Sequence, residues 1–79
     1  MQMKDLKCLE LEIAQMVSEI TGETVGVEAT RESVPAWDSL RHVEIIFAFE
    51  EAYGITLEEA EMTDLKTVKS LARRAASAR

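Results

Sequence analysis

Apolar side chains recur three and four positions apart along most of this chain, and an α-helix brings such positions onto one face. Two long runs cover residues 4–20 and 39–53. Each ends at a glycine, Gly22 or Gly54, which is typical of helix carboxyl ends. Shorter runs cover 57–62, before an expected break at 63–64, and 66–77. The low aromatic content, 5%, suits helices better than strands. The predicted fold is all-α, a four-helix bundle with a short third helix.

The same positions predict which face of each helix is buried. The second helix has the widest apolar face, so we expect it to be packed from two sides and to be the central helix. In the last helix, Ala76 is expected to point inward with its apolar neighbours. The apolar stripe of the first helix contains Leu6, Leu9, Ile13, Met16, Val17 and Ile20, the wide apolar face of the second contains Leu40, Val43, Ile46, Phe47, Phe49 and Tyr53, and the residues expected to point inward in the last are Val68, Leu71, Ala72, Ala75 and Ala76.

Residues 23–38 interrupt the helical spacing and predict a long loop between the first two helices. The only proline, Pro35, disfavours helical geometry at the residue before it. We expect one short turn of helix near residues 28–32. Loops of this length are often functional, so the segment is either a strap whose valines plug the core or a strap that is also an approach surface for a partner. These valines are Val25, Val27 and Val34.

Size and charge exclude several classes of protein. A chain of 79 residues makes one small domain, taken as residues 1–79, which favours a binding or carrier module over an enzyme with a deep cleft. Fifteen acidic against nine basic residues leave a net charge of −6, so no nucleic acid partner is expected. The sequence shows neither a long apolar stretch nor a secretory signal, which predicts no membrane span and a cytoplasmic protein. We expect a monomer.

Cysteine and histidine each occur once, which limits the chemistry that the chain can perform. Cys8 by itself forms neither an internal disulfide nor a zinc cluster, and without a neighbouring base it is expected to be an inert thiol. His42 has no evident triad partners and no metal ligand at a convincing spacing, so it is interpreted as a bystander on the helix surface. We therefore expect no catalytic residue and no metal site.

The charges are distributed unevenly along the chain. Residues 32–64 contain nine acidic and one basic residue, and this segment includes the second helix. It is either a solvated surface or a docking surface for a basic partner. Residues 65–79 contain five basic residues and no acidic one. The basic residues are Lys66, Lys69, Arg73, Arg74 and Arg79.

The triplet Asp38-Ser39-Leu40 lies where the long loop meets the second predicted helix. Asp38 or Ser39 is suited to cap this helix, since a short side-chain oxygen accepts a hydrogen bond from the first-turn amides. Ser39 has a second interpretation, as an exposed hydroxyl that receives a phosphate, because the first-turn amides and the helix dipole stabilise negative charge there. The triplet alone does not decide between the two.

Together with the residues that follow it, the triplet makes the sequence resemble the acyl carrier protein family. The resemblance covers roughly the whole chain, since the first helix and the long loop also have the expected lengths. The triplet is weak alone, but its combination with an acidic helix, a Glu-Glu-x-aromatic-Gly-Ile ending and a short third helix is specific. The matching residues are Asp38, Ser39, Leu40, Val43, Glu44, Ile46, Phe49, Glu50, Glu51, Ala52, Tyr53, Gly54, Ile55, Leu65, Lys66, Thr67 and Val68.

The resemblance implies that Ser39 carries a 4'-phosphopantetheine arm, installed by a separate phosphopantetheinyl transferase, whose thiol holds acyl groups as thioesters. Asp38 would help to cap the helix and lie where the transferase makes contact, and Leu40 would supply an apolar contact beside the arm. The protein would catalyse no reaction itself. Its partners would be acyl-loading, elongating or acyl-transferring enzymes with basic docking patches.

For docking, the resemblance assigns Glu44, Glu50 and Glu51 to an acidic surface, and such charge matching speeds encounter more than it tightens binding. Val43 and Phe47 lie near Ser39 on the same helix and are either docking contacts or core residues. For Phe47 the core is the favoured interpretation.

Five residues depart from the pattern common in fatty-acid carriers: Trp37, Arg41, His42, Phe47 and Phe49. Arg41 stands where an acidic residue is common, His42 follows it, and Trp37 is interpreted as a packing residue that holds the loop against the helix. These departures favour a specialised pathway, such as polyketide-like synthesis or acylation of a lipid or saccharide, over bulk fatty-acid synthesis. The alternatives are a non-covalent acidic helical interaction module and an aminoacyl or D-alanyl carrier.

Overall fold

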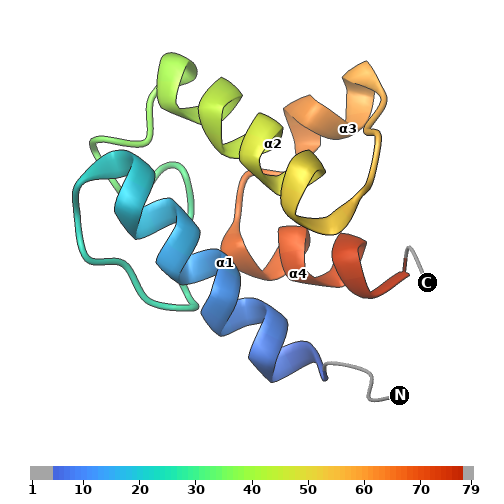
Figure 1. Ribbon diagram of the computed structural model, residues 1–79. Coiled ribbons are helices and arrows are strands. Elements are labelled where there is room, and N and C mark those ends of the chain that lie inside the picture. The colour runs from blue at the N-terminus through green and yellow to red at the C-terminus, as the bar shows by residue number, and fades with distance from the viewer. Residues whose placement is uncertain (1–4, 78–79) are drawn as a thin grey trace.

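Four helices make up the regular structure of residues 5–77, which are the residues that the computed structural model describes (Figure 1). They are α1 (Leu6–Thr21), α2 (Ser39–Tyr53), α3 (Glu59–Asp64) and α4 (Val68–Ser77). The predicted all-α fold, with its long loop before α2 and its short third helix, is confirmed. None of these helices is long and apolar enough to cross a membrane. Lys4, where the first helix was predicted to start, and Arg79 lie outside the described residues.

Side-chain caps and glycines explain why the first two helices lie close to where the sequence predicted them. The Asp5 carboxylate accepts a hydrogen bond from the Cys8 amide at 2.9 Å and starts α1. Gly22 and Gly54 follow α1 and α2 with φ values of 77° and 63°, in the left-handed region that glycine enters without a steric penalty. The bounds of α2 match the prediction, and those of α1 differ by two residues or fewer.

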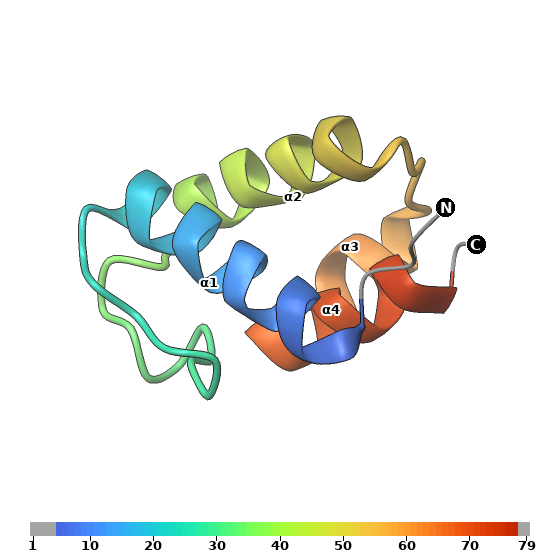
Figure 2. The same ribbon diagram turned by 60° about the horizontal axis from the view of Figure 1, so that its bottom comes forward.

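The core is built around α1, which packs against both α2 and α4 (Figures 1 and 2). Ile13 and Val17 of α1 have no exposed surface, and neither have Phe49 of α2 and Leu71 of α4. The prediction that α2 is the central helix is therefore wrong. The wide apolar face of α2 divides into two parts. One part is buried in the core and the other is exposed.

The long loop contains no helical turn at residues 28–32, contrary to expectation. Thr30 pairs instead with Thr67 in an isolated antiparallel bridge. Hydrogen bonds between the Thr30 and Ser33 side chains and backbones, at 2.9–3.1 Å, hold a tight turn, and this local bonding competes with a helix. Val34 is buried and both Val25 and Val27 pack against the core, as the strap interpretation predicted.

The third helix starts two residues later than predicted, because Glu58 and Glu61 form a capping box around its first turn. Thr63 and Asp64 belong to α3 rather than ending it. The last helix also starts two residues late, at Val68, since Lys66 and Thr67 lie in the bridge to the long loop, where the Lys66 carbonyl accepts a hydrogen bond from the Arg31 amide. Ala76 was predicted to point inward and is exposed.

Candidate functional site

Ser39 is the first residue of α2 and its side chain is exposed. The helix is capped by Asp38, whose Oδ1 accepts a hydrogen bond from the Arg41 amide at 2.9 Å. The two capping candidates of the sequence are thereby distinguished. Because Asp38 fills the capping role, the hydroxyl of Ser39 is not needed to start the helix and remains open to reaction.

An arginine from the long loop reaches this hydroxyl. Nη2 of Arg31 donates a hydrogen bond to Oγ of Ser39 at 2.9 Å. Arg31 could not be recognised from the sequence, because a contact between residues eight positions apart across a non-helical loop has no periodic signal. Only the path of the loop, fixed by its bridge to Thr67, brings the two residues together.

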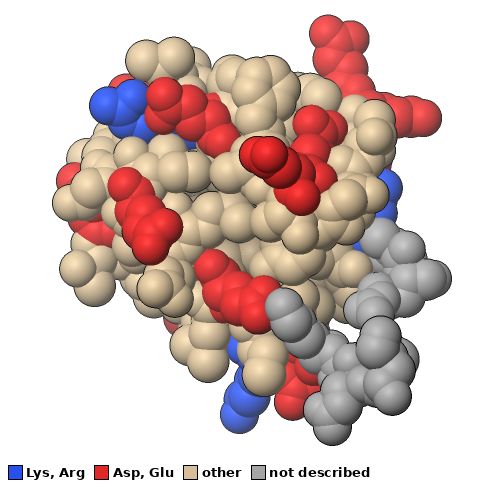
Figure 3. All heavy atoms as spheres, viewed as in Figure 1, with Lys and Arg blue, Asp and Glu red and all other residues tan. Residues whose placement is uncertain are grey.

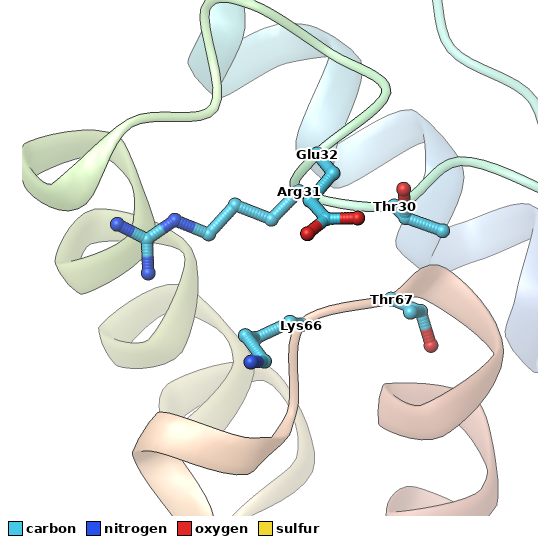
Figure 4. Close-up of a pocket in the computed structure, with 5 residues that line it drawn as sticks. All are labelled: Thr30, Arg31, Glu32, Lys66 and Thr67. Atoms are coloured by element: carbon cyan, nitrogen blue, oxygen red, sulfur yellow. The ribbon is translucent and has the colours of Figure 1, made fainter.

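Beside this contact lies a pocket of about 240 Å³ between the loop and the link that joins α3 to α4. Figure 4 shows the Arg31 side chain extended toward α2, with Lys66 on the facing wall of the pocket. The lining residues are Thr30, Arg31, Glu32, Lys66 and Thr67.

Trp37 and His42 form a buried polar link beneath the site. The indole Nε1–H of Trp37 donates to Nδ1 of His42 at 3.0 Å, and Nε2 of His42 lies 2.7 Å from the carbonyl oxygen of Met62. Because the indole nitrogen only donates, Nδ1 must accept, so Nε2 carries the proton and donates to Met62. The imidazole is therefore neutral and joins the residue before Asp38 to α2 and α3.

His42 is 7% exposed, so its interpretation as a surface bystander is wrong. The physical reason is its position in α2, where it lies four residues before Ile46 and seven before Phe49, both buried. Trp37 is 2% exposed and packs the end of the loop against α2, as predicted.

A second row of α2 side chains is left uncovered. Leu40, Val43 and Phe47 follow one another at spacings of three and four residues and are 63%, 47% and 59% exposed. We call these three residues the exposed apolar row. The core interpretation of Phe47 is wrong, because the row faces away from α1 and no described element packs over it.

The acidic residues of α2 have different surroundings. Glu44 and Glu51 are exposed, and Glu44 lies 3.4 Å from Nη1 of Arg41 in an ion pair. Glu50 is half-buried, and its Oε2 accepts a hydrogen bond from the Leu57 amide at 2.7 Å, so it braces the link between α2 and α3. In Figure 3 acidic side chains are spread over the visible face, while basic ones lie at its edges.

Cys8 lies exposed in the first turn of α1. The neighbouring Asp5 carboxylate raises the pKa of the Cys8 thiol above its usual value. Less thiolate is then present at neutral pH, as expected of an unreactive cysteine. Within residues 5–77, no three side chains of histidine, cysteine, aspartate or glutamate converge on a possible metal position.

Comparison with known proteins identifies the class to which this fold and this site belong. The profile of the phosphopantetheine attachment site family matches residues 36–75, which include Ser39 and run through most of α4. The chain is therefore a member of the phosphopantetheine-binding proteins. It is also 32% identical to the acyl carrier protein of Petrotoga mobilis, over 75% of this chain and 78% of that protein. Within this class, the chain belongs to the acyl carrier protein family.

The predicted cofactor, 4'-phosphopantetheine, follows from that membership. The arm is attached to a protein through a phosphodiester, which requires an accessible hydroxyl and an environment that tolerates negative charge. The exposed Ser39 hydroxyl, with the guanidinium of Arg31 at 2.9 Å, meets both requirements. Membership also implies that the chain interacts with a phosphopantetheinyl transferase and with acyl-handling enzymes.

Proposed function

We propose that Ser39 is the residue that carries the arm, and that the protein delivers acyl groups to partner enzymes without catalysing a reaction of its own. The observation that carries the proposal is the state of the Ser39 side chain, which is exposed, lies within the matched segment and is not the helix cap. The arm ends in a thiol, which supplies the thioester chemistry. Asp38 and Leu40 would serve the transferase, Asp38 by fixing the start of α2 and Leu40 by its outward-facing apolar surface.

Attachment requires Oγ of Ser39 to act as a nucleophile toward coenzyme A. As the bond from Oγ to phosphorus forms, the pyrophosphate bond breaks and adenosine 3',5'-bisphosphate leaves. The hydroxyl proton passes to a base of the transferase, which also supplies Mg²⁺. This chain contributes the hydroxyl and its placement on a fixed helix end.

We also propose that partners dock on α2 through the exposed apolar row and the carboxylates of Glu44 and Glu51. Apolar area at the centre and charge around it is the usual anatomy of a transient interface. The negative charge would speed encounter with a basic patch and allow fast release. Glu50, assigned to docking from the sequence, would act mainly through its bond to the Leu57 amide.

For the pathway we propose specialised acyl transfer, such as polyketide-like synthesis or acylation of a lipid or saccharide, rather than bulk fatty-acid synthesis. The support is Arg41, which places a positive charge two residues after Ser39 and pairs with Glu44. If general fatty-acid elongation enzymes used the loaded protein as fast as their own carrier, this assignment would be wrong. The cytoplasmic and monomeric state expected from the sequence stays a prediction.

The test of the arm is intact mass after incubation with coenzyme A, Mg²⁺ and a broad-specificity phosphopantetheinyl transferase. The wild type should gain the mass of one arm and Ser39→Ala none. Ser77→Ala, which removes an exposed serine at the end of α4, is the matched control and should be modified like the wild type.

Modification of Ser39→Ala would place the arm elsewhere. No gain by folded wild-type protein, with this transferase and with a second one from the same genome, would favour the non-covalent interaction module. A loaded arm that accepts an amino acid and no acyl group would favour the aminoacyl or D-alanyl carrier.

A further inference from the structure

The guanidinium group of Arg31 contacts an uncharged hydroxyl rather than a carboxylate, although the protein is acidic. Within residues 5–77, the guanidinium groups of Arg41 and Arg74 lie against the carboxylates of Glu44 and Glu61, at 3.4 and 2.6 Å. Arg31 forms no ion pair in the same range, and its side chain bonds to the uncharged hydroxyl of Ser39. A full positive charge is thus held against the atom that would become a phosphate ester.

The position of Arg31 is set by the backbone on both sides of it. Its amide donates to the Lys66 carbonyl at 2.8 Å, and the Val68 amide donates to the Ala29 carbonyl at 3.1 Å. The turn formed by Thr30 and Ser33 holds one side of this bridge. A matching turn formed by Thr67 and Ser70 holds the other side of the bridge, with hydrogen bonds of 2.9–3.2 Å. The backbone of Arg31 is therefore held in place, and this position brings its side chain within hydrogen-bond distance of Ser39.

Ser39 lies at a boundary on α2. It is three residues before His42 and seven before Ile46, in line with the buried side of the helix, while Leu40 begins the exposed apolar row next to it. An arm on Oγ therefore has two routes, over the exposed apolar row or toward the pocket of about 240 Å³. Arg31 and Lys66, which line that pocket, place two cations on one route only (Figure 4).

We propose that Arg31 holds the phosphodiester of the arm and directs the arm into the pocket between the long loop and the α3–α4 link. The inference rests on Ser39 carrying the arm. The non-bridging phosphate oxygens would lie two bonds beyond Oγ, within reach of the guanidinium that now contacts Oγ, and a charged acceptor makes that hydrogen bond stronger. Lys66 supplies a second positive charge from the facing wall. The arm at rest then leaves the exposed apolar row open to partners.

The experiment uses the arm-loaded full chain, with loading first verified by intact mass. Two signals are measured: the phosphorus-31 resonance of the phosphodiester, and proton contacts between the geminal methyl groups of the arm and the Thr67 side chain. The wild type should show the contacts. Arg31→Gln should lose them and shift the phosphorus resonance. Arg31→Lys, which keeps the charge but not the planar donor pair, should retain part of the effect.

Arg41→Gln is the matched control, because it removes the same charge two residues from Ser39 on the side paired with Glu44. It should keep the Thr67 contacts and shift the resonance less than Arg31→Gln. Equal shifts for the two variants, or no contact to Thr67 in the loaded wild type, would overturn the inference while leaving the carrier function intact. Failure of the folded wild type to load with either of the two transferases would instead refute the proposed function. If Arg31→Gln loads poorly, the presence or absence of the Thr67 contacts in the loaded wild type decides whether the arm enters the pocket.

Discussion

At the scale of single residues, His42 shows how one buried polar group joins three segments. Its two ring nitrogens meet the indole of Trp37 and the Met62 carbonyl at 3.0 and 2.7 Å. Both bonds use the same neutral tautomer, so the imidazole is fully satisfied although it is nearly buried. The loop end that leads into Asp38 is thereby fixed to α2 and α3 by side chains that do not contact the Ser39 hydroxyl.

Replacing His42 by Ala should destabilise the protein by about 1–3 kcal/mol, because the buried indole N–H of Trp37 loses its acceptor. The measurement is urea unfolding followed by far-ultraviolet circular dichroism. Trp37→Phe and the double variant complete a mutant cycle, which should show a coupling above about 0.5 kcal/mol. Additive effects of the two substitutions would mean that the link contributes nothing to stability.

At the scale of elements, α2 has one buried side and one exposed apolar side. Ile46 and Phe49 enter the core, while Leu40, Val43 and Phe47 form the exposed apolar row. A monomer exposing three large apolar side chains in sequence on one helix usually reserves them for a partner. The single wide apolar face expected from the sequence therefore consists of a buried face and the exposed apolar row.

Phe47 and Phe49 allow these two sides to be separated by the same substitution. Phe49→Ala should cost about 3–5 kcal/mol of stability, because it empties a site with no exposed surface. Phe47→Ala should change stability by about 0.5 kcal/mol or less, as an exposed position does. Phe47→Ala should nevertheless lower the rate of acyl transfer to partner enzymes.

Thermal and urea unfolding of the two variants measure the change in stability. Transfer kinetics with a cognate enzyme measure the change in the rate of acyl transfer. A large loss of stability in Phe47→Ala would show that the exposed apolar row is covered in solution. Unchanged transfer kinetics would remove Phe47 from the docking surface.

Some elements of the fold could be predicted from the sequence and others could not, for physical reasons. The long helices could be predicted because caps and glycines mark their ends, as Asp38 and Gly54 do for α2. The bridge of Thr30 to Thr67 and the late start of α4 could not, because both depend on backbone hydrogen bonds between segments distant in sequence, from Arg31 to Lys66 and from Val68 to Ala29. Ser39, the proposed attachment residue, was singled out by its motif, whereas Arg31 contacts it only through the path of the loop.

At the scale of the whole molecule, two basic residues of α4 form ion pairs with acidic residues outside α2. Arg74 of α4 pairs with Glu61 of α3 at 2.6 Å, and Lys69 of α4 pairs with Glu28 of the loop at 3.2 Å. The basic last helix is thus complementary to α3 and the loop rather than to α2, as far as the described residues show. The docking carboxylates of Glu44 and Glu51 are accordingly not engaged by α4.

The Glu61–Arg74 pair predicts how the molecule responds to acid. The hydrogen bond from Arg74 holds the pKa of Glu61 below its ordinary value of 4.5, with help from a backbone bond at Glu58. A carboxyl whose pKa is depressed by folding stabilises the folded state above the unfolded pKa and loses that effect as pH falls through the folded pKa. Below pH 4.5 the wild type should therefore lose stability more steeply than Glu61→Gln.

Urea unfolding at a series of pH values between neutrality and about 3 measures this difference. Arg74→Gln should flatten the acid dependence in the same way, because it removes the other member of the pair. The pKa of Asp5 is also lowered, chiefly by the Cys8 amide, so some acid dependence remains in both variants. Parallel pH profiles for the wild type and Glu61→Gln would contradict the prediction.

The position of Cys8 has a practical consequence. The first turn of α1 and the first turn of α2 lie at opposite ends of the molecule in Figure 1 and well apart in Figure 2, so the only cysteine of the chain is remote from Ser39. A fluorophore coupled to Cys8 before the arm is installed would report rotational diffusion without obstructing the α2 surface. Fluorescence anisotropy of such a conjugate would then follow association with each enzyme in turn, including the transferase proposed to act on Ser39.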